Sequence, residues 1–113
     1  MDFNEYQKKS RVTAIYPNLG DNLPYLALGI AGEAGEVADK VKKFIRDDHF
    51  SSIKDLTPEQ KTGVVKELGD ILWYISQIAT EFDFTLEQLA QINIEKLSSR
   101  MNRKELQGSG DER

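Results

Sequence analysis

The sequence predicts an all-α protein, and three features support this. Apolar residues recur at helical spacing along most of the chain, whereas the alternation typical of strands is weak throughout. Two segments, "TPEQ" at residues 57–60 and "TLEQ" at 85–88, have the form of a capping box at a helix start. A length of 113 residues suits one small domain with a modest core. We therefore expect a four-helix bundle that is completed by oligomerisation.

Four helical segments are expected along the chain. Asn22 or Leu23 suits the cap of the second, with Pro24 in its first turn. Thr57 and Thr85 suit the caps of the third and fourth. The predicted helices cover residues 2–15, 24–46, 58–82 and 86–104, and "DDHFSSIKDL" connects the second to the third. We expect one domain over residues 1–106, followed by a flexible glycine-rich tail over residues 107–113.

Composition excludes several classes of function. A formal net charge of −4 argues against a nucleic-acid-binding surface, which needs a basic face. The chain contains no cysteine, so disulfides and thiolate chemistry are excluded. It has no apolar run long enough for a membrane span, and "MDFNEYQKKS" lacks a signal-peptide core. We expect a soluble cytoplasmic protein with no nucleic-acid or membrane partner, in which His49 is a loop residue.

The second predicted helix carries an acid where an apolar residue is expected. Its apolar stripe consists of Leu26, Ile30, Val37, Val41 and Phe44. Glu33 falls in the middle of that stripe, and Glu36 lies beside it, one turn further on. A carboxylate that points toward a core is costly unless it is paired or binds a metal. Glu33 is therefore the first candidate for a functional residue.

The third predicted helix repeats this arrangement. Its apolar stripe consists of Val64, Leu68, Ile71, Ile75 and Ile78. Glu67 and Asp70 flank that stripe, and Tyr74 extends the same strip by one turn. Either acid pair alone is also typical of a solvent-exposed helix face. Two pairs on facing helices would bring four carboxylates together, and a divalent cation would relieve their repulsion. Oxygen ligands favour Mg²⁺ or Mn²⁺.

The fourth predicted helix adds basic and amide groups. Its apolar stripe consists of Leu86, Ala90, Leu97 and Met101. Asn93 falls inside that stripe, and Lys96 and Arg100 flank it. The two cations suit either ordinary surface ion pairs or the lining of a polyphosphate site beside a metal.

Three glycines, at positions 29, 32 and 35, lie along the second helix next to its acids. Each costs about 1 kcal/mol relative to alanine in a helix interior. A strip without side chains lets a helix or a ligand approach the backbone closely, although helix packing alone would also explain it.

The motifs "GEAGEV" and "KELGDILWYI" resemble the Glu-x-x-Glu…Glu-x-x-Asp signature of the MazG-like, all-α nucleoside triphosphate pyrophosphohydrolases. The segments "EYQKKSRVTAIYP", "NIEKLSSR" and "GSGDER" extend the resemblance over nearly the whole chain. The resemblance implies hydrolysis of a (deoxy)nucleoside triphosphate to the monophosphate and pyrophosphate. It also implies a homodimer or homotetramer, and Mg²⁺, with Mn²⁺ as a substitute, held by Glu33, Glu36, Glu67 and Asp70.

This resemblance also suggests roles for individual residues. Glu36 or Glu33 would orient the attacking water. Tyr74 would stack on the base, whereas Trp73 falls on the far side of the helix and suits a core, an interface or a partner's site equally well. Purine deoxynucleotides such as dGTP are the expected substrates. The residues expected to contact the substrate are Lys40, Lys43, Tyr74, Asn93, Lys96 and Arg100.

Two alternatives remain open from the sequence. One is a catalytically silent helical module for oligomerisation or binding, which a broken set of acids would favour; here all four acids are present. The other is the sister activity on phosphoribosyl-ATP. An assay for pyrophosphate release separates the first alternative from an enzyme, and a panel of substrates separates the second.

Overall fold

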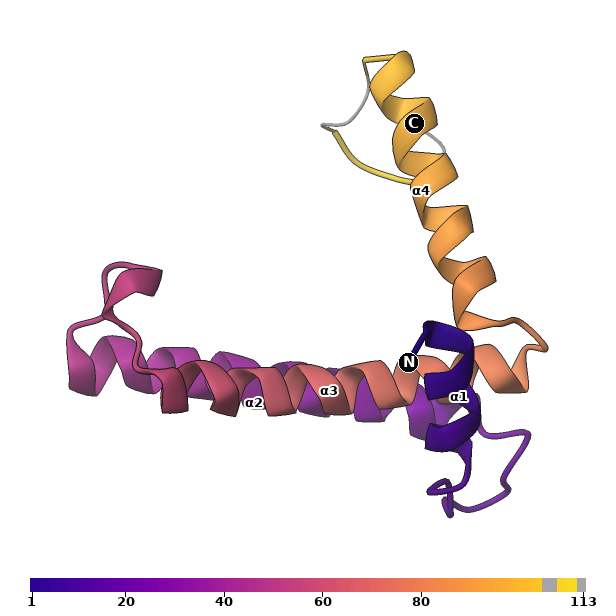
Figure 1. Ribbon diagram of the computed structural model, residues 1–113, viewed down its shortest axis with the longest axis horizontal. Coiled ribbons are helices and arrows are strands. Elements are labelled where there is room, and N and C mark those ends of the chain that lie inside the picture. The colour runs from indigo at the N-terminus through magenta and orange to yellow at the C-terminus, as the bar shows by residue number, and fades with distance from the viewer. Residues whose placement is uncertain (105–107, 112–113) are drawn as a thin grey trace.

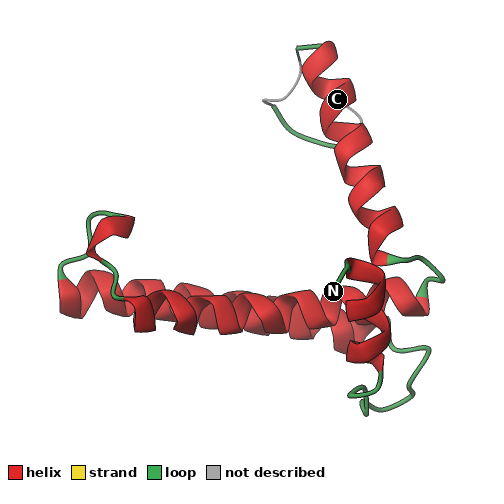
Figure 2. Cartoon of the chain, viewed as in Figure 1, coloured by secondary structure: helices red, strands yellow, loops and turns green. Residues whose placement is uncertain are grey.

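The computed structural model describes residues 1–104 and 108–111, and all regular secondary structure in that part of the chain is helical (Figure 2). Its elements are α1 (Phe3–Arg11), α2 (Leu23–Asp48), the short 3₁₀ helix η1 (Ile53–Asp55), α3 (Pro58–Glu81) and α4 (Leu86–Asn102). The predicted all-α class is confirmed. Within the described residues, no helix has the length and apolar character that crossing a bilayer requires. The predicted boundary at residues 106–107 and the tail residues 107, 112 and 113 lie outside the described residues.

Helices α2 and α3 lie side by side and form a long hairpin, with η1 at its turn (Figure 1). The predicted stripe of α2 faces α3, since Leu26 and Phe44 are buried and Ile30, Val37 and Val41 are partly buried. The stripe predicted for α3 is wrong at one position, because 49% of Leu68 is exposed. A helical wheel does not show how much of a helix surface the neighbouring helix covers. Leu68 lies outside the surface of α3 that α2 covers.

Helix α1 packs on α3 near one end of the hairpin, and the main core lies there (Figure 1). Ala14, Tyr16 and Leu26 are buried together, and the partly buried side chains of Trp73, Tyr74 and Ile78 pack against them. Tyr16 stacks on Tyr25 with 5.4 Å between ring centroids and meets the Trp73 indole edge-on. The loop between α1 and α2 is therefore part of the core.

Polar groups reinforce this corner. The Tyr16 hydroxyl donates a hydrogen bond to the Glu81 carboxylate, which also accepts hydrogen bonds from the backbone N–H groups of Asn22 and Gly20. Partial burial opposes the ionisation of Glu81, but these hydrogen bonds and the charge of Arg11 outweigh it and lower the pKa of Glu81. Glu81 thus ties the end of α3 to the loop that leads into α2.

The predicted caps are confirmed, but two helix ends differ from the prediction. Asn22, Thr57 and Thr85 each accept a hydrogen bond from the third residue after them. Helix α1 ends at Arg11 rather than near residue 15, because the Thr13 hydroxyl donates to the Ser10 carbonyl at 2.7 Å and the chain turns there. Helix α2 continues to Asp48, where exposed His49 adopts a left-handed conformation and ends it.

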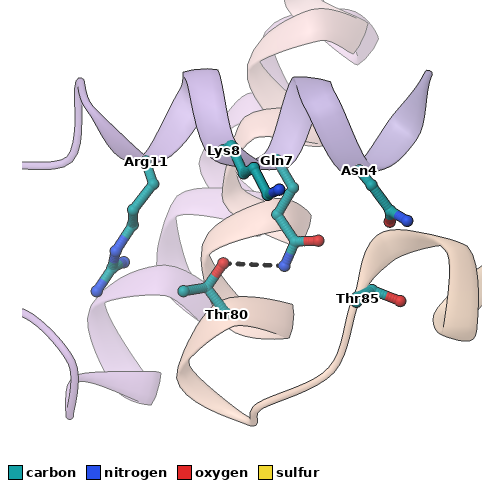
Figure 3. A pocket seen from close by; sticks show the side chains of 6 residues that line it. All are labelled: Asn4, Gln7, Lys8, Arg11, Thr80 and Thr85. Atoms are coloured by element: carbon teal, nitrogen blue, oxygen red, sulfur yellow. Dashed lines mark hydrogen bonds between the residues drawn. The ribbon is translucent and has the colours of Figure 1, made fainter.

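A single amide links α1 to the junction of α3 and α4. The Gln7 Nε2 donates to the Thr80 hydroxyl (Figure 3). It also donates to the Phe84 carbonyl, and the Gln7 Oε1 accepts from the Leu86 N–H. Gln7 and Thr80 line a hollow of about 520 Å³, together with Lys8 and Arg11. Because Gln7 and Thr80 already bond each other and Arg11 bonds Tyr16 and Gln77, we assign this hollow a structural role.

Helix α4 points away from the hairpin (Figure 1). In the part of the chain that the structure describes, α4 contacts α1 and α3 and makes no contact with α2. The four helices therefore do not close into a bundle within one chain, and completion of the predicted bundle by a second chain stays a proposal.

The three glycines of α2 have different surroundings. A Cβ at Gly29 would overlap ring carbons of Tyr74, so the bare backbone at this position allows the ring to lie against α2. Side chains at Gly32 or Gly35 would meet no heavy atom of the described chain within 4 Å outside their own turn of helix. The close-approach explanation therefore holds within this chain for Gly29 alone.

We predict that Gly29→Ala lowers the free energy of unfolding by about 1–3 kcal/mol, because overpacking against Tyr74 outweighs the gain in helix propensity. The matched control, Gly32→Ala, should raise it by up to about 1 kcal/mol, because it gains propensity without a clash. Urea denaturation of both variants measures the difference. Equal destabilisation by Gly32→Ala would mean that this glycine makes a close contact outside the single chain.

Candidate functional site

Three of the four predicted carboxylates lie together between α2 and α3. Glu33 on α2 and Glu67 and Asp70 on α3 each offer an oxygen, and these oxygens all lie within 4.8 Å of one another. Glu67 and Asp70 share one face of α3 because they are three residues apart. Glu33 and Glu67 are partly buried, whereas Asp70 is exposed. We call Glu33, Glu67 and Asp70 the acid cluster.

Electrostatic repulsion shapes this cluster. The pKa of Glu33 is raised, first because burial disfavours the charged form, then because of the negative charge of Asp70 and a hydrogen bond with Glu67. Glu67 and Glu36 add smaller repulsions to the pKa shift of Glu33. A carboxyl in such surroundings gains a proton readily, and a divalent cation would relieve the same repulsion more completely. The donor set of carboxylate oxygens fits a hard cation such as Mg²⁺.

Glu36 lies at the margin of the cluster. It is exposed and is not among the three residues whose oxygens converge. Its charge still contributes to the raised pKa of Glu33, so it is a near neighbour. Its predicted role as a metal ligand stays a prediction.

The two lysines predicted on α2 have different partners. Lys40 Nζ lies 3.6 Å from the Glu67 Oε1, at the border of the acid cluster. Lys43 Nζ lies 2.7 Å from Asp39 Oδ2, in an ion pair on the exposed side of the helix. Lys40 is therefore placed to meet an anion bound at the cluster, whereas Lys43 is engaged on its own helix.

An aromatic cleft adjoins the acids. It has a volume of about 300 Å³ and is lined by Thr13, Glu33, Asp70, Trp73 and Tyr74. The Trp73 and Tyr74 rings meet edge to face with 5.0 Å between centroids. Burial and then the negative fields of Tyr25, Glu33 and Asp70 raise the pKa of Tyr74, so its phenol keeps its proton at neutral pH. The cleft thus combines two carboxylates with two aromatic side chains.

The expectation that Trp73 falls on the far side of α3 is wrong. Its indole Nε1 donates to the Thr13 hydroxyl at 2.7 Å, and both side chains line the cleft beside Glu33 and Asp70. A helical wheel gives the direction in which a side chain leaves the helix, but a long indole can turn toward a partner on another element. Thr13 was missed because it lies in an irregular segment 60 residues away in sequence. No local signal identifies it.

The three residues predicted on α4 lie apart from the acids. Asn93 is exposed, while Lys96 and Arg100 both bond the carboxylate of Asp111. Because α4 and α2 make no contact among the described residues, one chain does not bring these groups to the acid cluster. Their predicted contact with a substrate would need a second chain or a movement of α4.

Sequence comparisons agree with the resemblance in the motifs. A family model described as the MazG nucleotide pyrophosphohydrolase domain matches residues 21–104. The chain is 43% identical over 120 aligned positions to the Gene 37 protein of Mycobacterium phage L5, with both chains covered in full. It is 30% identical over 79 positions to the Bacillus subtilis (strain 168) protein YvdC, covering 68% of this chain and 74% of that one. No solved structure matches the chain. This chain belongs to the MazG nucleotide pyrophosphohydrolase domain family.

Proposed function

We propose that this protein hydrolyses (deoxy)nucleoside triphosphates to the nucleoside monophosphate and pyrophosphate, with Mg²⁺ as cofactor and Mn²⁺ as a substitute. The observation that carries the proposal is the convergence of Glu33, Glu67 and Asp70 beside an aromatic cleft. Membership of a pyrophosphohydrolase family supports the same reaction class.

The acid cluster would hold the cation, and Glu36 would join by a rotation of its exposed side chain. A bound Mg²⁺ supplies positive charge for the phosphate oxygens and lowers the pKa of a water ligand. Glu36 or Glu33 would orient the attacking water and take its proton. Lys40, held at the border of the cluster by Glu67, would neutralise a phosphate oxygen as negative charge shifts to the leaving group.

The aromatic cleft would hold the nucleobase. Tyr74 and Trp73 present ring surface next to Glu33 and Asp70, so a stacked base would leave its phosphates near the cation. A purine has a larger face to stack than a pyrimidine, and purine deoxynucleotides such as dGTP are the first substrates to test. Rates for all eight common triphosphates, with phosphoribosyl-ATP alongside, would establish the preference.

We predict that Glu33→Gln weakens Mg²⁺ binding and lowers turnover by about 100-fold or more, because it removes one charge from the cluster and keeps its size. Calorimetric titration with Mg²⁺ and an assay for pyrophosphate measure the two effects. The matched control is Glu59→Gln, because Glu59 is an exposed acid in the first turn of α3. Full activity of Glu33→Gln would remove Glu33 from the site.

The same variant should be more stable than the native protein without metal, and the gain should depend on pH. Because the folded pKa of Glu33 lies above its ordinary value of 4.5, its ionisation destabilises the fold as pH rises through that range. We expect Glu33→Gln to raise the melting temperature in EDTA at pH 7 and to have no such effect near pH 4. An equal rise in melting temperature at pH 7 and pH 4 would show that the ionisation of Glu33 does not destabilise the fold.

We predict that dGTP yields dGMP and pyrophosphate in equal amounts, with no diphosphate intermediate. A cation held by Glu33, Glu67 and Asp70 would neutralise phosphate charge and so make pyrophosphate a better leaving group when water attacks the α phosphorus. Hydrolysis in ¹⁸O-labelled water should place the label in the monophosphate, as mass spectrometry would show. Label in pyrophosphate would mean attack at the β phosphorus, and free phosphate as the first product would exclude the proposed reaction.

We also propose a homodimer or homotetramer. Helix α4 exposes Leu97 in the middle of its apolar stripe, and 39% of that side chain is accessible. Other apolar side chains exposed on α4 are Leu89, Ile92, Ile94 and Met101. A second chain that covers this surface would complete the bundle.

We predict that the protein is at least dimeric at micromolar concentration, and that Leu97→Asp shifts it toward the monomer by placing a charge in the interface. Light scattering coupled to size exclusion measures both states. Ser98→Asp, with the same charge on an exposed position of the same helix, should leave the mass unchanged. A monomeric native protein would contradict the proposal.

A further inference from the structure

Two cationic side chains of α4, Lys96 and Arg100, are bonded to a carboxylate of the same chain, that of Asp111. The Asp111 Oδ1 accepts hydrogen bonds from Lys96 Nζ at 3.1 Å and from Arg100 Nη2 at 3.3 Å. Arg100 Nη2 also donates to the backbone carbonyls of Gly110 and Asp111, at 3.2 and 3.0 Å. One carboxylate and two carbonyl oxygens thus converge on one face of a cationic pair. Gly110 and Asp111 of the predicted tail therefore contact α4.

Arg100 is enclosed but incompletely bonded. Its side chain is only 6% exposed, whereas that of Asp111 is 80% exposed. The buried Arg100 Nε has no hydrogen-bond partner among the described residues, although a guanidinium usually binds an anion through two nitrogens. The Asp111 carboxylate and its neighbouring carbonyls all meet Nη2 and leave Nε unused. A phosphate, with more acceptor oxygens in a tetrahedral arrangement, could engage both nitrogens.

The Asp111 contact is also of a kind that exchanges easily. Water reaches the Asp111 carboxylate, and its ion pair with the partly exposed Lys96 is of the kind that adds little to stability. Gly110 has a φ of +85°, which glycine adopts without strain and which turns the Asp111 backbone back toward Arg100. Hydrogen bonds from Lys96 and then Arg100, together with their charges, lower the pKa of Asp111, so it is an anion at neutral pH.

We propose that Asp111 blocks Lys96 and Arg100, the two cations of α4 expected to contact the substrate, until the pyrophosphoryl group of a nucleoside triphosphate or released pyrophosphate displaces it. The choice of anion rests on the proposed function. The exchange makes and breaks no covalent bond: a dianionic or trianionic phosphate group replaces one carboxylate and the two carbonyls on Arg100.

This exchange explains how Arg100 can be buried and still bind a ligand. Arg100 Nη2 is occupied by Gly110 and Asp111, and displacement of Asp111 would free it together with Lys96. The carboxylate then acts as a competitor for the site. Removing its charge should tighten anion binding, whereas a purely structural Asp111 that positions the two cations should weaken binding when it is changed.

The first test is calorimetric titration of inorganic pyrophosphate into the full-length protein in EDTA. Asp111→Asn keeps the shape of the side chain and removes the charge, and we expect it to bind pyrophosphate about fivefold more tightly than the native protein. The matched control is Glu95→Gln, which removes the same charge from an exposed position of α4 and can still bond Gln91. The control should bind pyrophosphate as the native protein does.

Lys96→Gln should lose most of this binding in both the native and the Asp111→Asn backgrounds. It is preferred to changes at Arg100 because the Lys96 side chain is 38% exposed and its loss should leave the fold intact. Equal or weaker binding by Asp111→Asn would overturn the exchange. Equal tightening by Glu95→Gln would overturn it as well, because the effect would then be one of net charge.

The second test follows the displaced segment itself. In protein labelled with ¹⁵N-glycine, saturating pyrophosphate should shift the amide signals of Gly108 and Gly110, with Gly20 as an internal control that stays in place. A non-hydrolysable triphosphate analogue in a parallel titration shows whether the intact substrate causes the same shift. Unchanged Gly108 and Gly110 signals with both anions would overturn the proposal.

These measurements are made without metal and without turnover. Displacement in a protein that hydrolyses no triphosphate would leave this site standing and remove the proposed function. Hydrolysis of the triphosphate without displacement of Asp111 would support the proposed function and exclude the exchange at Lys96 and Arg100.

Discussion

The close contact between the Tyr74 ring and the bare backbone of Gly29 is the constraint on which both the fold and the candidate site depend. It lets α3 lie against α2 where any other residue would hold the helices apart. The same ring lines the cleft next to Glu33 and Asp70. A glycine that is unfavourable for the isolated helix thus becomes favourable in the folded chain, because the close packing exceeds its cost of about 1 kcal/mol.

The acid cluster opposes the packing that creates it. Partial burial and mutual repulsion raise the pKa of Glu33, so the metal-free fold is less stable at neutral pH than its apolar contacts alone would make it. The core at the end of the hairpin offsets this cost, and the hydrogen bonds on Glu81 fix the loop that leads into α2. Because contacts elsewhere hold α2 against α3, the oxygens of Glu33, Glu67 and Asp70 converge in the folded chain without a cation.

Local signals were sufficient for much of this protein. The caps at Asn22, Thr57 and Thr85 were predicted correctly because a cap is formed by residues three positions apart. The position of Glu33 beside Glu67 followed from helical periodicity, because an acid within an apolar stripe must face whatever that stripe packs against. The all-α class followed from the same periodicity, and the family was recognisable from the spacing of the acids.

By itself, then, the sequence determined the helices, most of their ends and the faces that they bury, since these depend on neighbours within one or two turns. Only the tertiary structure decided which distant groups meet. It joined Trp73 to Thr13, left Glu36 at the margin of the cluster and directed α4 away from the hairpin, where Arg100 bonds Asp111. Periodicity specifies the face of a helix but not its partner, because the partner depends on the direction in which each connecting loop sends the next helix.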